Sequence, residues 1–99
     1  MEHHNDVLLS GIVANEPQIR ELGDGREVLQ WRMKIFRPDS GSDSIACSAE
    51  SKQVIKSVTA AGQGGELEIA GSLRSRFWNS GGGMGSRLEV DVTKAKRIR

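Results

Sequence analysis

The sequence is poor in the residues that build cross-linked or metal-bound scaffolds. Its 99 residues include one cysteine, Cys47, so an intramolecular disulfide and a multi-cysteine zinc site are both excluded. Tyrosine is absent and only four residues are aromatic, so a lone domain of this length buries a modest core. The longest apolar runs fall far short of the roughly 18 residues that cross a bilayer, and no basic-then-apolar leader opens the chain. We therefore expect one cytoplasmic domain that does not enter a membrane.

Motifs for catalysis are also missing. The sequence has no H-E-x-x-H, no G-x-S-x-G and no G-x-x-x-x-G-K-[ST]. The glycines of segment 81–85 lead from one strand pattern into another, so no helix N-terminus follows to hold a phosphate. His3 and His4 have no further ligands nearby in sequence, so no metal site is predicted. The sequence predicts a protein that is not an enzyme and uses no cofactor.

Alternating apolar residues predict two strands in the first half of the chain. Segment 6–14 carries apolar side chains on both faces, which is typical of a largely covered strand. In segment 28–37, Leu29, Trp31 and Met33 fall on one face, while cationic side chains fall on the other. Trp31 is therefore expected in the core.

A short strand and one helix are expected next. Segment 45–49 places Cys47 on its inner face, where it would act as a small buried hydrophobic residue. Segment 48–61 has apolar residues at helical spacing, with Ser48 or Ser51 as the N-cap and a glycine after its end.

Two further strand patterns follow the helix. Segments 66–78 and 87–93 alternate, and the glycine-rich stretch 79–86 between them is expected to be a flexible hairpin loop. The residues expected to face the core are Leu67, Ile69, Leu73, Phe77, Leu88, Val90 and Val92. The carboxylates of Glu89 and Asp91 fall on the opposite face, where charge most often serves solubility.

The order of these elements predicts the fold class. Five strands with one short helix between strands 3 and 4 match an all-β protein, a Greek-key barrel of the OB type, which binds oligonucleotides or sugars on one face. We expect residues 6–99 to form this OB domain and residues 1–5 to be flexible.

A cationic face with an aromatic residue points to nucleic acid. Arg32 and Lys34 share the solvent face of one strand, and Arg74, Arg76 and Trp78 share that of another. If these faces converge, cations can follow the phosphates while a ring stacks on a base, which is what single-stranded DNA requires. The alternative is that the cations only solvate the barrel and that Trp78 packs in a subunit interface.

Charge distribution favours the binding interpretation. The formal net charge is +1, yet the segment from residue 69 to residue 99 carries seven cations and two acids. Phe36 lies on the solvent face of its strand beside Arg37, so it is either a second stacking residue or part of a contact between protomers.

Several blocks resemble the bacterial single-stranded DNA-binding proteins (SSB). Asn5 to Gly11 is similar to the opening N-x-V-x-L-x-G strand of that family, and Glu16 to Arg20 is similar to its D-P-E-x-R segment. Gly25 to Ile35 resembles the next strand, and Gly71 to Trp78 resembles G-x-L-x-x-R-x-[WY], whose terminal aromatic stacks on bases. The chain looks most like the short SSB-like proteins of actinobacteria. The resemblance implies homodimers or homotetramers that bind single-stranded DNA during replication, recombination and repair, and it adds Arg20 as a contact.

Departures from the family modify this expectation. The strand at 44–50 lacks the aromatic residues that the family carries there, so one or two stacking contacts are missing. The chain ends at Arg99 without the linker and acidic tail that recruit enzymes, so recruitment through a tail is not expected. The predicted nucleic-acid contacts are Arg20, Arg32, Lys34, Arg74, Arg76 and Arg87 for phosphates, and Trp78 and Phe36 for stacking.

Two other functions remain open at the level of sequence. The missing aromatics are also typical of an OB-fold module that contacts proteins, such as a primosomal or paralogous SSB subunit, and binds DNA weakly or not at all. RNA is the third possibility, because a stacking groove does not read the 2′-hydroxyl unless a specific contact is built for it.

Overall fold

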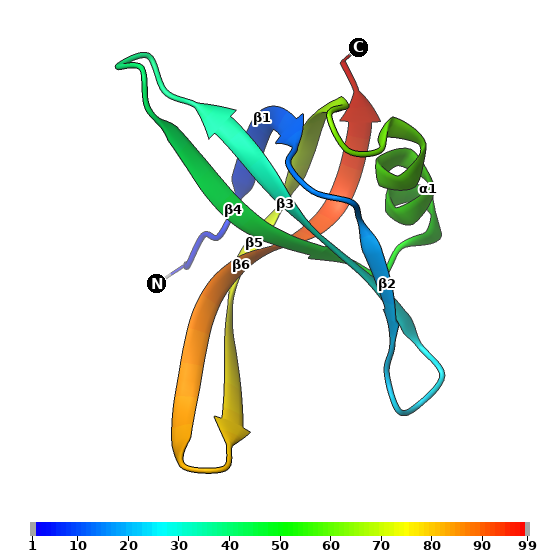
Figure 1. Cartoon of the computed structure of the whole chain (residues 1–99), viewed down its shortest axis with the longest axis vertical. Helices are drawn as coiled ribbons and strands as arrows, with labels where there is room; N and C mark the ends of the chain where they lie inside the picture. Colours follow the sequence, from blue (N-terminus) through cyan, green and yellow to red (C-terminus); the bar gives the residue numbers. More distant parts are fainter. Residues whose placement is uncertain (1, 99) are drawn as a thin grey trace.

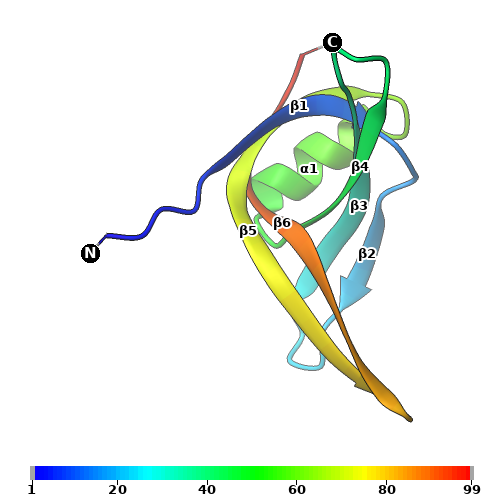
Figure 2. The same cartoon turned by 90° about the vertical axis from the view of Figure 1, so that its left-hand side faces the viewer.

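The computed structural model describes residues 2–98, and for residues 78–80 it describes the backbone only. The elements are β1 (Val7–Val13), β2 (Gln18–Glu21), β3 (Glu27–Phe36), β4 (Ser42–Ala49), α1 (Lys52–Ala61), β5 (Glu66–Ser80) and β6 (Gly83–Arg97). Figures 1 and 2 show one strongly curved sheet, from which long hairpins project beyond the curved body.

The strands close into a ring. Their order is β1-β5-β6-β4-β3-β2, and β1 pairs with β3 as well as β5, so five strands form the closed barrel and β2 extends its edge. All pairings are antiparallel except that of β4 with β6, which is parallel. The predicted five-stranded barrel with one helix after its third barrel strand is confirmed. The short strand β2 was not predicted as a separate strand, because it is only four residues long and fully exposed.

Two glycines allow the strands to approach where the ring closes and bends. A Cβ on Gly11 would lie 2.5 Å from the carbonyl oxygen of Lys34 on β3, so a side chain here would push β1 and β3 apart. A Cβ on Gly71 would overlap the carbonyl oxygen of Asp91 on β6. Next to Gly71 the register shifts, and Thr93 is the extra residue of this β-bulge.

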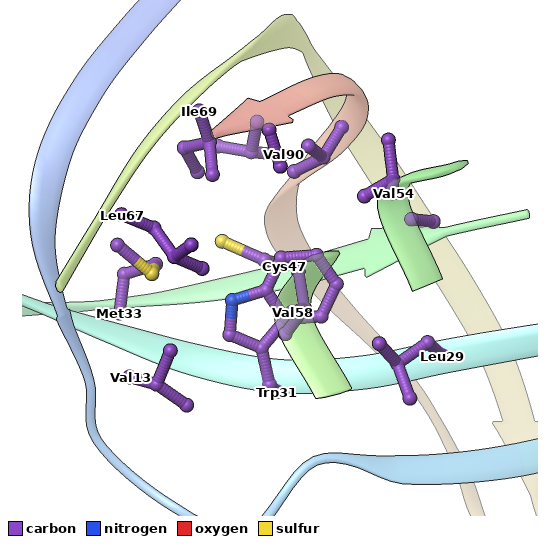
Figure 3. Packing of buried hydrophobic residues seen from close by; sticks show 13 residues of the cluster. Val13, Leu29, Trp31, Met33, Cys47, Val54, Val58, Leu67, Ile69 and Val90 are labelled. Carbon is purple, nitrogen blue, oxygen red and sulfur yellow. The ribbon is translucent and has the colours of Figure 1, made fainter. Parts of the chain in front are cut away.

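The core fills the barrel and is made largely from β3, β5, β6 and α1. Figure 3 shows the indole ring of Trp31 in the middle of the labelled buried side chains. The buried hydrophobic residues are Val13, Leu29, Trp31, Met33, Cys47, Ala49, Val54, Val58, Leu67, Ile69, Val90, Val92 and Ala95. The predictions that Trp31 and Cys47 lie inside are confirmed. Burial raises the pKa of the Cys47 thiol to about 12, so this thiol stays protonated.

The helix begins and ends where its capping residues predict. The Ser51 side chain accepts a hydrogen bond from the backbone N–H of Val54, and Gly62 ends the helix with a φ of 67°, a left-handed value that favours glycine. Of the two predicted N-caps, Ser51 is therefore confirmed. Ser48 instead lies in β4, where it is buried.

The β5–β6 hairpin differs most from the sequence prediction. The segment 79–86 is strand except for a turn at Gly81 and Gly82, so the prediction of a long flexible loop is wrong. Glycine-rich strands carry no alternating pattern, so the sequence could not reveal that the pairing continues to the tip. We call residues 73–88 the arm.

The arm also leaves apolar side chains in solvent. Leu73, Phe77 and Leu88 have the inward alternation of barrel residues, yet they are 42%, 70% and 60% exposed. The prediction that they face the core is wrong, because this part of the hairpin extends past the other barrel strands (Figure 2). On β1, Leu8 is likewise 70% exposed, so that strand is not covered on both faces.

Candidate nucleic-acid interface

A groove lies between the arm and the hairpin that joins β2 to β3. Figure 1 shows both hairpins projecting from the same end of the barrel. The groove has a volume of about 750 Å³. Its lining residues are Arg20, Leu22, Arg26, Val28, Gln30, Glu50, Arg74, Arg76, Arg87, Glu89 and Asp91.

Strand pairing explains how residues that are distant in sequence meet here. Arg74 lies opposite Glu89, and Arg76 lies opposite Arg87, in the β5–β6 ladder. Across the groove, Arg20 pairs with Val28 in the β2–β3 ladder. Because alternate residues of a strand share a face, each ladder turns a short row of side chains into the groove.

A buried carboxylate holds two of the arginines. Glu89 is only 2% exposed, and its Oε1 accepts hydrogen bonds from Ser48 Oγ at 3.0 Å and from Arg76 Nε at 2.5 Å. Its Oε2 accepts a hydrogen bond from a terminal nitrogen of Arg87 at 3.3 Å. The prediction that Glu89 faces solvent is therefore wrong, because Arg76 on β5 and Arg87 on its own strand cover it. Such pairing is the condition under which a buried charge is tolerated.

Weaker ion pairs neutralise two more arginines. Arg74 Nε lies 3.6 Å from Asp91 Oδ2 on the arm side. On the other side, Arg26 lies 2.8 Å from Asp24 and 3.3 Å from Glu50. Hydrogen bonds from the backbone N–H and then the side chain of Arg26 lower the pKa of Asp24. These exposed pairs orient the arginines without strongly stabilising the fold.

Arg20 differs from the other groove arginines. Its side chain forms no ion pair or hydrogen bond with any residue that the structure describes. All the donors of its guanidinium are therefore available to an anion, and an arginine can hold a phosphate through two parallel hydrogen bonds.

A second basic group lies outside the groove, on the outer face of β3. Arg32 donates to Ser44 Oγ at 2.7 Å and to the Ser44 carbonyl at 2.9 Å. Farther along, the Lys34 ammonium lies 5.2 Å from the ring centre of Phe36, which is 63% exposed. This spacing is that of a cation–π contact, and it keeps an exposed ring beside a positive charge.

Comparison with known proteins bears on the fold. No model of a protein family matches the sequence, and no curated protein matches it. Among solved structures, the chain is similar to the Plasmodium falciparum SSB, solved in a complex with single-stranded DNA. The TM-score is 0.81, the sequence identity is 18%, and the match covers 100% of this chain and 98% of that one.

This chain has the OB fold. The similarity extends over the barrel, the helix and both hairpins, because it covers the whole chain. At this identity it establishes the architecture, and the chemistry of the groove has to be argued from this chain's own residues.

The structure divides the predicted contacts into two groups. Arg20, Arg74, Arg76 and Arg87 line the groove together, whereas Arg32, Lys34 and Phe36 are not among its lining residues. The backbone of position 78 pairs with Gly85 in the arm, but the Trp78 side chain lies outside the described residues. Among the side chains that the structure describes, the groove lining contains no aromatic residue.

Several groove residues escaped the sequence prediction. Arg26, Gln30, Glu50 and Asp91 were not predicted as contacts. A signal existed for Gln30, because it lies two residues before Arg32 on the same face of the strand. Arg26 follows a turn, where no alternation indicates the direction of a side chain.

Neither a membrane segment nor a metal cluster is found in the described part of the chain. Its one helix is too short and too polar to span a bilayer. Within residues 2–98, no three His, Cys, Asp or Glu side chains gather closely enough to hold a metal ion.

Proposed function

We propose that this protein binds single-stranded DNA of any sequence in the groove between the arm and the β2–β3 hairpin. The observation that carries the proposal is the set of five arginines on the two sides of one groove, in an OB barrel whose fold matches an SSB solved with single-stranded DNA. Arginine can bind phosphates through hydrogen bonds and can also stack on bases. The arginines of the groove can therefore contact both the backbone and the bases of a single strand.

Arg20, Arg74, Arg76 and Arg87 are the proposed phosphate contacts in the groove. Arg32 and Lys34 are proposed to continue the path along β3, with Phe36 as a stacking surface. Trp78 is proposed to stack on a base because it follows Arg76 at strand spacing. None of these roles requires catalysis or a cofactor. A cytoplasmic protein of this kind would protect single strands during replication, recombination and repair.

Self-association is part of the proposal. The exposed apolar residues Leu8, Leu73, Phe77 and Leu88 are what a homodimer or homotetramer would cover. The relation to bacterial SSB proteins, and to the short actinobacterial type, is likewise proposed on the sequence blocks described above.

The test measures the fluorescence anisotropy of a labelled mixed-sequence oligonucleotide of about 16 nucleotides, within the range that OB folds occupy. We expect binding that weakens as salt rises, because each neutralised phosphate adds about −0.7 to the slope of log K against log salt for single strands. Duplex of the same sequence should bind more weakly. No binding at low salt would overturn the proposal.

One arginine provides a sharper test. Arg20→Gln should weaken binding by about fivefold and reduce the salt slope by about one phosphate contact, because Arg20 has no competing partner in the described chain. Lys56→Gln, an equal change of charge on an exposed position of α1, is the matched control. Equal losses in the two variants would show that only the overall charge matters.

A protein-interaction module is the second candidate function. The observation that favours it is the apolar face of the arm, on which Phe77 is 70% exposed. In that case the protein would form complexes with a partner while the anisotropy of the oligonucleotide stayed unchanged.

A further inference from the structure

The arginines and the other polar groups of the groove stand on different elements. The five arginines stand on the arm and on the β2–β3 hairpin, while Gln30, Glu50 and Asp91 lie on or beside the barrel strands, where Gln30 pairs with Ser48 and Ser48 pairs with Asp91. A DNA backbone carries negative charge along its whole length, so it is attracted to the arginines and repelled by the carboxylates. A strand in this groove therefore places its phosphates against the two sides and its bases toward the middle.

The polar groups in the middle have hydrogen-bonding capacity left over. Among the residues that the structure describes, Asp91 has a single ionic contact, with Arg74 at 3.6 Å, which is beyond hydrogen-bond distance. Within the same residues, Glu50 uses only Oε1, at 3.3 Å from Arg26. The Gln30 side chain makes no hydrogen bond within the described residues. At least three carboxylate oxygens and one amide group can thus meet a base.

Carboxylate oxygens accept hydrogen bonds and cannot donate them. Cytosine, adenine and guanine present an exocyclic amino group, which is a donor, and Glu or Asp accepting from the cytosine N4 amino group is an established pairing. Thymine has a carbonyl oxygen in that place, and its one ring donor, N3–H, stands between two carbonyl oxygens that both repel a carboxylate. Phosphate contacts hold any sequence, but these acceptors distinguish bases that carry an amino group from bases that do not.

Resting on the proposed function, we propose that Glu50 and Asp91 give the groove a preference for the bases with an exocyclic amino group, cytosine, adenine and guanine, over thymine. The two carboxylates are specificity-determining residues and the arginines supply the common affinity. The preference concerns base composition and involves no reading of base order.

The experiment compares oligo-dC with oligo-dT of equal length in competition against one labelled oligonucleotide, at mildly alkaline pH, where cytosine is not protonated. We expect oligo-dC to bind about threefold to tenfold more tightly, as one or two hydrogen bonds to charged acceptors would give. Binding with equal affinity for both, or tighter binding of oligo-dT, overturns this inference and leaves the proposed function standing. Absence of binding to both overturns the two together.

Variants assign the preference to its residues. Asp91→Asn and Glu50→Gln replace an acceptor by an amide that both donates and accepts, so the ratio of the oligo-dC and oligo-dT affinities should fall toward one. Glu68→Gln is the matched control, because Glu68 pairs with Lys96 at 3.8 Å outside the groove and carries the same charge. An unchanged ratio in both groove variants overturns the assignment.

A chemically modified oligonucleotide tests the same preference without changing the protein, so the result does not depend on whether a variant folds. Cytosine methylated twice at N4 keeps its ring and its acceptors but has no amino hydrogen. With the unmodified protein, the preference over oligo-dT should disappear for this oligonucleotide. A preference that persists would show that the amino group is not what the groove recognises.

Discussion

The β5–β6 ladder contains two halves with the same alternation and opposite environments. In the barrel half, Leu67 and Ile69 are fully buried. In the arm half, Leu88 and Phe77 continue the alternation and are mostly exposed. Alternation specifies which side of a strand a residue faces, whereas burial depends on whether another element covers that side. In this chain the cover ends where the hairpin leaves the closed ring.

The strongest test of this comparison truncates the same residue type in each half. Leu67→Ala should lower the free energy of unfolding by about 2–5 kcal/mol, because it leaves a cavity in the core. Leu88→Ala should lower it by less than about 1 kcal/mol, since its side chain is 60% exposed. Chemical denaturation of both variants measures the difference. Similar losses would mean that the arm is covered in solution, for example by a second copy of the chain.

The buried carboxylate of Glu89, next to the base of the arm, offers a second test. Glu89→Ala removes the acceptor that Ser48, Arg76 and Arg87 share, and we expect a loss of about 1–3 kcal/mol in unfolding free energy. Glu68→Ala removes a carboxylate from an exposed pair with Lys96 and should cost less than about 1 kcal/mol. If Glu89→Ala leaves the free energy of unfolding unchanged, Arg76 and Arg87 do not depend on the Glu89 carboxylate for their positions.

The smallest expected effect is a change of stability with pH that comes from Cys47 in the barrel core. Burial raises the pKa of Cys47 from its ordinary value of 9.0 to about 12, so above pH 9 the unfolded chain loses a proton that the folded chain retains. Stability from this group is complete below pH 9 and is lost as the pH rises toward 12, by about 1 kcal/mol between about pH 8 and about pH 10. Urea denaturation at the two pH values should show this loss in the wild type and not in Cys47→Ala. Equal pH dependence in both proteins would contradict a buried, protonated thiol.

The sequence predicted the barrel well because strand alternation and capping are local. Trp31 and Met33 on β3 and the Ser51 cap could be placed from a few neighbouring residues. The site was harder, because the groove joins Arg20 to Arg74 through pairings between strands that are distant in sequence. Glu89 was misplaced for the same reason: its partners Arg76 and Ser48 lie on other strands, so no local pattern shows that it is covered.

The bulge at Thr93 makes the length of β6 as important as its composition. Val92 and Ala95 both face the core although they are three residues apart, because Thr93 is the extra residue between them. If β6 kept its length but lost the bulge, strict alternation would turn Ala95 outward and Lys94 inward, against the core. Deleting Thr93 itself removes only the extra residue and leaves Val92 and Ala95 inward. The bulge therefore sets which side chains of the last strand reach the core, and Thr93 is the residue of β6 whose loss the alternation should tolerate.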